Sequence, residues 1–150
     1  PEAPLAKCVE FIRLFADACH HGKEEDLLFP VLESRGIPRD GGPIGVMLYE
    51  HQVGRSLVAE MASALAALGQ EQDVAKQRFV KAARQYNELL LNHIFKEDNV
   101  LFRMGDQVMS PQDQKALADR FSEVGCSAFE GKRCGDLRKI ADDLESLHAK

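Results

Sequence analysis

The sequence predicts an all-α protein built as an antiparallel helical bundle, and two observations support this fold class. Apolar residues recur at spacings of three and four through most of the 150 residues, as in helices with one buried face. No segment shows the apolar–polar alternation of a convincing strand. Long amphipathic helices of this kind bury their apolar stripes by packing side by side.

Each long helix is expected from its apolar stripe and from the residues that begin or end it. The first is expected over residues 5–33, with a kink or a fresh turn at Pro30, which lacks the backbone N–H of a helical ladder. The second is expected over residues 43–68, because proline suits the first helical turn. The third is expected over residues 74–104, with Gly105 ending it.

The C-terminal part is expected to form two shorter helices. Ser110-Pro111-Gln112-Asp113 resembles a capping box with proline at the first helical position, and predicts a helix to about residue 124. Residues 125–135 are expected to be irregular, and residues 136–148 to form the last helix. These helices could cap the bundle, replace a missing helix or form a dimer contact.

Length and composition fit one globular domain and exclude several functions. A chain that is 45% hydrophobic and 29% charged can bury a sizeable core, with residues 5–105 carrying the site and residues 110–150 as an extension of the same 1–150 domain. The net charge of −5 leaves no basic surface for nucleic acid. No apolar run approaches the ~18 residues of a membrane span. Four cysteines without Cys-x2-Cys spacing predict buried thiols and a reducing, cytoplasmic location.

One short pattern occurs twice, and the functional prediction depends on it. Residues 20–30 read HHGKEEDLLFP and residues 93–102 read HIFKEDNVLF, so each copy places a histidine shortly before two acids. His51 lies between the copies, on the expected inner stripe of the second helix. Each histidine alone would more often be structural. Three on separate helices, with matching acids, predict a two-metal site inside the bundle.

The spacing suggests which side chains meet. Residues four apart share a helical face, so His21 and Glu25 can bind one metal together. In the second copy, regular geometry pairs His93 with Glu97, whereas alignment of the copies matches Asp98 to Glu25. Asp98 could be the ligand if its carboxylate bridges two ions, or if the helix contains a π-bulge. Imidazole and carboxylate ligands suit iron, manganese or zinc, and the absence of paired cysteines argues against a thiolate zinc site.

The neighbouring polar residues are expected to have lesser roles. His20 is turned ~100° from His21 and is expected to be a neighbour of the ligands. Glu24 and Glu97 are expected to face solvent or to orient the imidazoles. Tyr86 is expected to serve in packing.

These residues resemble the hemerythrin-like, or HHE cation-binding, family. The matching pieces are HHxKEExxLFP at residues 20–30, EHxxxR at residues 50–55 and HIxxEDxxLF at residues 93–102. Their order and spacing both agree with the family. The resemblance implies a four-helix bundle with a non-haem di-iron centre, in which two carboxylates bridge the irons. The metal ligands that it implies are His21, Glu25, His51, His93 and Asp98.

Two departures from the family pattern concern the nitrogen ligands. The family has an earlier helix that carries a histidine ligand, and nothing before Leu5 supplies one. That helix is either absent from this chain or replaced by another segment or subunit. Oxygen-carrying members also have a second histidine on the middle helix, whereas Met47 and Arg55 lie four residues to either side of His51. The site is therefore expected to be poorer in nitrogen than that of an oxygen carrier.

Three functions from different classes follow from these observations. The first is an iron-binding protein that binds or senses O2, or handles iron or NO. The second is an oxidase- or peroxidase-like enzyme using the same metals, which an open coordination position would favour. The third is a metal-free helical interaction module that retains the ligand residues. A homodimer is expected if the bundle leaves an apolar face uncovered.

Overall fold

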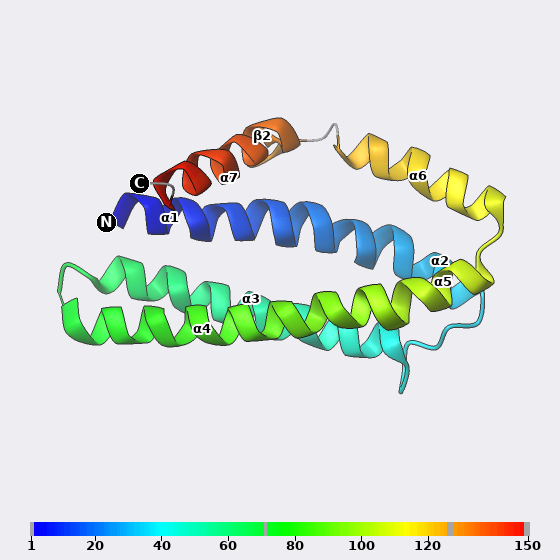
Figure 1. Ribbon diagram of the computed structural model, residues 1–150, viewed down its shortest axis with the longest axis horizontal. Coiled ribbons are helices and arrows are strands. Elements are labelled where there is room, and N and C mark those ends of the chain that lie inside the picture. The colour runs from blue at the N-terminus through cyan, green and yellow to red at the C-terminus, as the bar shows by residue number, and fades with distance from the viewer. Residues whose placement is uncertain (1, 71, 126–127, 149–150) are drawn as a thin grey trace.

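Three long helical rods and a C-terminal segment make up the computed structural model, which describes residues 2–70, 72–125 and 128–148 (Figure 1). The first rod comprises α1 (Glu2–Phe11), the π-helical segments η1 (Ile12–His21) and η2 (Glu24–Leu28), and α2 (Phe29–Ser34). The second rod is α3 (Pro43–Ala67). The third rod comprises α4 (Gln72–Lys96), the π-helical η3 (Glu97–Leu101) and α5 (Phe102–Val108). Successive rods run antiparallel, which confirms the predicted fold class.

The C-terminal segment packs on the outer side of the first rod (Figure 1). Its elements are α6 (Pro111–Gly125), the two-residue strands β1 (Ala128–Phe129) and β2 (Lys132–Arg133), and α7 (Cys134–His148). Helix α7 lies along α1, and α6 contacts η2. Ion pairs from Arg13 to Glu130 and from Lys132 to Glu10 join the hairpin to the first rod. The segment expected to be irregular thus contains this small hairpin, while residues 126–127 lie outside the described part.

Most helix boundaries follow the sequence signals. The second rod ends one residue before the predicted position, and α6 begins with the predicted capping box. There the Ser110 hydroxyl oxygen accepts a hydrogen bond from the Asp113 N–H at 3.1 Å, and the Asp113 carboxylate accepts one from the Ser110 N–H at 2.9 Å. The α-helical turn α2 begins at Phe29, directly after π-helical η2, so Pro30 lies in its first turn, where a missing backbone donor is tolerated.

The prediction that Gly105 ends the third rod is wrong. Gly105 is buried within α5, and the helix continues to Val108. A Cβ atom at position 105 would lie 3.2 Å from Cδ2 of Leu32 in the first rod, which is too tight without a shift of that side chain. The glycine therefore allows the first and third rods to approach closely.

Two apolar clusters leave a polar layer between them. The larger cluster contains Leu27, Leu28, Phe29, Leu32, Ile37, Ile44, Met47, Leu101 and Leu117. The smaller cluster contains Val9, Val58, Met61, Ala82 and Tyr86. In each rod, the sequence passes from one cluster to the other through a histidine: His21, His51 or His93. Among the described residues, no helix is both long and apolar enough to cross a membrane.

Candidate metal centre

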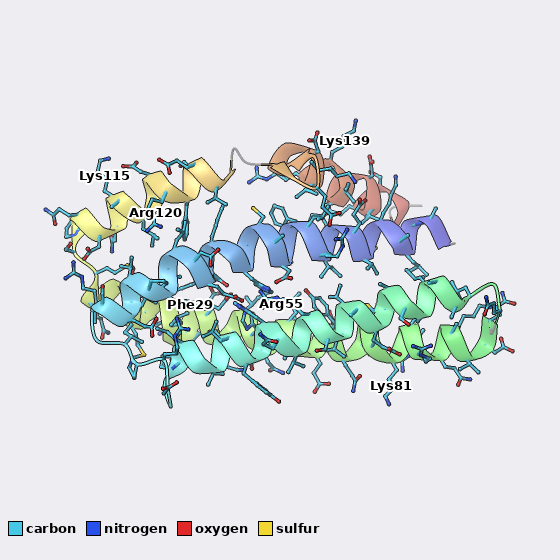
Figure 2. All side chains as sticks on the ribbon, turned by 180° about the vertical axis from the view of Figure 1, so that it is seen from behind. Phe29, Arg55, Lys81, Lys115, Arg120 and Lys139 are labelled. Carbon is cyan, nitrogen blue, oxygen red and sulfur yellow. The ribbon has the colours of Figure 1, made fainter. Side chains whose placement is uncertain are left out.

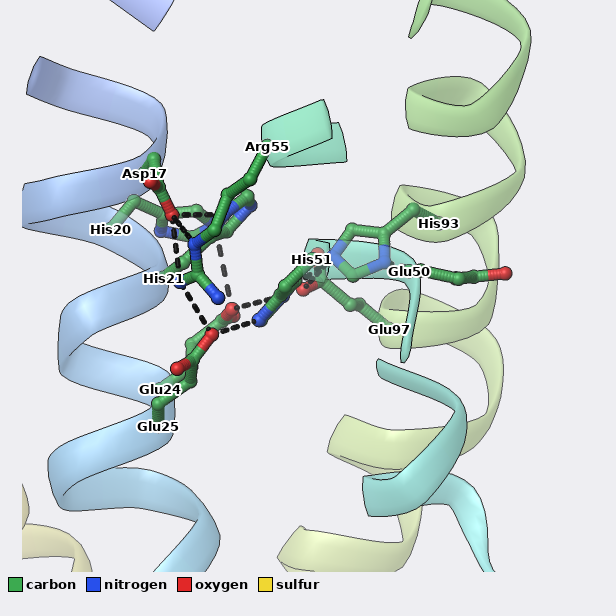
Figure 3. A network of polar contacts seen from close by, with 10 residues as sticks. All are labelled: Asp17, His20, His21, Glu24, Glu25, Glu50, His51, Arg55, His93 and Glu97. Carbon is green, nitrogen blue, oxygen red and sulfur yellow. Dashed lines mark hydrogen bonds and ion pairs between the residues drawn. The ribbon is translucent and has the colours of Figure 1, made fainter. Parts of the chain in front are cut away.

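Three histidines, one from each rod, converge in the polar layer between the apolar clusters (Figure 3). His21, His51 and His93 are only 7%, 1% and 4% exposed. The His21 and His51 rings stack with their centroids 3.8 Å apart, and the Nε2 atoms of His51 and His93 are 3.2 Å apart. The structure therefore brings together the three histidines that the sequence pattern singled out.

Each imidazole presents its Nδ1 atom to a carboxylate. The pairs are His51 with Glu25 at 2.7 Å, His93 with Glu50 at 3.0 Å and His21 with Asp17 at 3.3 Å. A carboxylate at Nδ1 favours the tautomer that donates its proton there, which leaves the lone pair on Nε2. A histidine oriented in this way is prepared to bind a metal ion through Nε2.

Cationic side chains in turn hold these outer carboxylates. The Arg55 guanidinium donates hydrogen bonds to Asp17 at 2.8 Å and to Glu25 at 2.7 Å, and Figure 2 shows Arg55 between the first rod and α3. Lys96 pairs with Glu50 in the same way. Burial opposes ionisation of Asp17, but contacts with His21 and Arg55 outweigh it and lower its pKa. The arginine of the EHxxxR motif thus helps to orient the imidazoles.

Two further carboxylates, Glu24 and Glu97, are buried where the Nε2 atoms meet. They are 3% and 4% exposed. A Glu24 oxygen is 3.4 Å from His51 Nε2, and a Glu97 oxygen is 3.0 Å from His93 Nε2. With both carboxylates ionised, both Glu24 oxygens and Oε1 of Glu97 have no hydrogen-bond partner. Such groups are costly to bury unless a cation neutralises them.

The electrostatics of the two carboxylates reflect this crowding. Burial raises the pKa of Glu24 to about 8, and the neighbouring Glu97 adds to the rise through its charge and by accepting a hydrogen bond from protonated Glu24. Burial also opposes ionisation of Glu97, but the adjacent His93 outweighs it and lowers the pKa of Glu97. Without a cation, the pair therefore keeps one proton on Glu24 at neutral pH.

The metal-free protein is expected to lose stability as the pH rises from 7 to 8.5. Glu24 has a pKa of about 8 when folded, against 4.5 for an exposed glutamate, so the folded chain binds more protons over this range. Stability must then fall with increasing pH, by about 1 kcal/mol. His93, whose pKa is also raised, acts in the same direction, whereas His20 and His51 have lowered pKa values and are already neutral.

Urea denaturation of metal-free protein at the two pH values measures this change. The Glu24→Gln variant should lose most of the pH dependence and serves as the control. Equal or greater stability at pH 8.5 in the unmodified chain would contradict the buried position of the Glu24 carboxyl.

At both acidic positions, the carboxylate buried beside the histidines lies one residue before the predicted ligand. Glu25 is half-buried and binds His51 Nδ1 and Arg55. Asp98 is exposed, and no contact among the described residues joins it to the histidines. Glu24 and Glu97, expected to face solvent or to orient imidazoles, are the buried pair. Both buried acids form regular i,i+4 contacts, Glu97 with His93 at 3.0 Å and Glu24 with His20 at 3.6 Å, so ordinary helical spacing accounts for their positions.

The sequence contained a signal for these two acids. When the two copies are aligned on Lys23 and Lys96, Glu24 matches Glu97, and each lies four residues after a histidine. Those histidines are His20 and His93, and the His20–Glu24 contact is present at 3.6 Å. His20 is thus close to the cluster, although half of its side chain is exposed.

Among the residues that the structure describes, two overlapping sets of side chains could hold metal ions. The first set is His21, Glu24, His51 and His93, and the second is His20, Glu24 and Glu97. Within each set, the donor atoms lie within 4.8 Å of one another. Both sets share Glu24, so the two positions are adjacent and one carboxylate could bridge them. Nitrogen and oxygen donors without thiolates suit iron, manganese or zinc. We call these six residues the histidine cluster.

A helical bundle with such convergent donors defines a class of cation-binding protein, and comparison with known proteins agrees. Residues 1–105 match the Hemerythrin HHE cation binding domain, and the chain belongs to this family. It is thus a metal-binding helical protein.

Relatives of the chain occur in mycobacteria. The uncharacterized proteins Mb2018 of Mycobacterium bovis and Rv1995 of Mycobacterium tuberculosis are each 28% identical to it over 153 aligned positions. These alignments cover 98% of this chain and 57% of the length of each relative. No solved structure gives a significant match.

Proposed function

We propose that this chain is a non-haem iron protein whose histidine cluster holds two iron ions. The observation that carries the proposal is the pair of buried carboxylates, Glu24 and Glu97, whose unpartnered oxygens lie beside imidazole nitrogens. His21, His51 and His93 would share one ion with Glu24, and His20 with Glu97 would hold the second. The proposal assigns Glu24 and Glu97 as ligands in place of Glu25 and Asp98.

The proposed role is binding or sensing of O2, or the handling of iron or NO. Bound iron would supply a redox-active centre to which such small molecules bind. Neither residue four positions from His51 adds a nitrogen ligand, because Met47 is buried in the larger apolar cluster and Arg55 holds outer carboxylates. A nitrogen-poor ligand set leaves coordination positions for a small molecule.

The cellular setting and oligomeric state complete the proposal. We place the protein in the reducing cytoplasm, because none of the four cysteines has Cys-x2-Cys spacing. Cys126 and the side chain of Cys134 lie outside the described part. The surface proposed for a homodimer is the face of α4 on which Leu91 and Phe95 are 63% and 65% exposed.

An oxidase- or peroxidase-like enzyme is the second candidate function. The observation that favours it is a cavity of about 290 Å³ that His21 and Tyr86 help to line. This volume exceeds what a diatomic molecule needs, so a larger substrate could approach the histidine cluster. Turnover of peroxide by iron-loaded protein, absent in a His93→Ala variant, would favour the enzyme over a binding protein.

Iron loading tests the proposed function. Metal-free protein supplied with Fe(II) under anaerobic conditions is expected to retain about two irons per chain after desalting. Its melting temperature should rise with iron concentration, because the ions bind the native state. Asp98→Asn should behave like the unmodified chain, since Asp98 is exposed. Fewer than one iron per chain, with no thermal shift, would instead favour the metal-free interaction module.

A further inference from the structure

A second candidate binding site lies beside the histidine cluster, in the cavity of about 290 Å³ between η1 and α3. Its walls come from three rods, and their apolar part consists of Ile12, Gly54, Val58, Ala59, Ala62 and the ring of Tyr86. Ala59 and Ala62 are exposed, so these two small residues lie where the cavity meets the surface. Apolar cavities of roughly half this volume bind benzene.

The charged residues that line the cavity have their charged groups engaged elsewhere. Arg13 pairs with Glu130 through two contacts, and Arg55 donates hydrogen bonds to Asp17 and Glu25. An ionic ligand would therefore have to compete with existing ion pairs. The cavity instead suits a neutral molecule, which would pack against methylene groups and apolar side chains.

Tyr86 connects this cavity to the histidine cluster. Tyr86, His21 and Gly54 line both the large cavity and a much smaller one, of about 10 Å³, that also borders His51 and His93. Burial raises the pKa of Tyr86 to about 12, so the phenol stays neutral and can donate a hydrogen bond. Among the described residues, no hydrogen bond engages its hydroxyl group.

We propose that this cavity binds a neutral, largely apolar organic molecule, about the size of one or two fused aromatic rings, that carries a single hydroxyl or N–H group. The molecule would contact Ala59, Ala62 and Val58 with its apolar part, and its polar group would pair with Tyr86. It would then lie directly beside the histidine cluster, because His21 also lines the cavity. The proposal goes beyond iron binding, and it concerns a site that is already formed without a metal.

Ligand-observed NMR titrations of the metal-free chain with phenol, indole and benzoate test this proposal. Phenol and indole are expected to bind saturably. Benzoate should bind at least about tenfold more weakly, because its carboxylate would be buried without a partner. Tyr86→Phe should weaken phenol binding roughly fivefold, the contribution of one hydrogen bond, and leave benzene binding unchanged.

A matched pair of variants on α3 locates the site. Ala62→Trp should fill the cavity and weaken phenol and indole binding by about tenfold or more. Ala66→Trp makes the same change one helical turn away, outside the lining residues, and should leave binding unchanged. Both alanines are exposed, so neither variant is expected to disturb the core.

Three results would overturn the proposal: no saturable binding of phenol or indole, equal binding by the two tryptophan variants, or benzoate binding as tight as that of phenol. Because the titrations use metal-free protein, their outcome is independent of iron loading. Failure here would leave the iron site standing, and failure of iron loading would leave this site standing.

Discussion

His51→Ala is expected to lower the affinity for iron by more than about 100-fold, because loss of a ligand should cost more than the 10–100-fold typical of an outer-shell partner. His51 has the central position in the cluster. Its ring stacks on His21 at 3.8 Å, and its Nε2 atom lies 3.2 Å from His93 Nε2 and 3.4 Å from Glu24. Removing this imidazole takes away a nitrogen donor that lies within 3.4 Å of two other donor atoms. Anaerobic titration with Fe(II), followed by absorbance and by metal analysis, measures the loss.

Asp98→Asn is the matched control for this variant. Asp98 is a predicted ligand that lies outside the cluster. The iron affinity of the variant should therefore stay within about twofold of that of the unmodified chain, because substitutions at exposed positions usually have small effects. Circular dichroism would show whether His51→Ala remains helical. Two irons bound with nearly unchanged affinity in folded His51→Ala would contradict the proposed centre.

Glu24→Gln is expected to have two effects of opposite direction. Iron affinity should fall by roughly 100-fold, and the number of ions bound should drop, because Glu24 belongs to both donor sets. The metal-free protein should become more stable at pH 8.5, by about 1 kcal/mol, because a buried carboxylate without a hydrogen-bond partner is removed. Metal analysis and urea denaturation measure the two effects separately.

The adjacent variant Glu25→Gln makes the same chemical change one residue along the chain. Glu25 contacts His51 Nδ1 and Arg55, so its replacement should weaken iron binding only about tenfold and leave two ions bound. If Glu25→Gln loses an ion and Glu24→Gln does not, then Glu25 is the metal ligand, as the sequence pattern predicts. The buried position of Glu24 would then be incorrect.

Local signals were sufficient to predict most of the fold. Pro43 and the capping box at Ser110 act within a few residues of where they stand, so they located the starts of α3 and α6. Gly105 does not end the third rod, and its sequence context is ambiguous because glycine both ends helices and permits close packing. Only the position of Leu32, more than seventy residues away in the chain, distinguishes these roles. The apolar stripes of the C-terminal helices likewise do not indicate which rod these helices pack against.

The three histidines of the candidate site were predicted to meet and do so, whereas the sequence left the choice between adjacent acids open. His21, His51 and His93 lie on the inner stripes of three rods, so neighbouring rods necessarily bring them together. The choice between adjacent acids depends on helical register. In the second copy two sequence signals disagree, because regular helical spacing pairs His93 with Glu97, whereas alignment of the copies matches Asp98 to Glu25, and the structure has the regular pair. The unpartnered oxygens that now support a cation site could be recognised only in three dimensions.

Anomalous diffraction at the iron edge, from crystals of iron-loaded protein, tests the central claim most directly. The account predicts two adjacent peaks among the rods, one within coordination distance of His21, His51 and His93, with Glu24 reaching both. Absence of any peak in this layer, or peaks bound by Glu25 and Asp98 in place of Glu24 and Glu97, would contradict it.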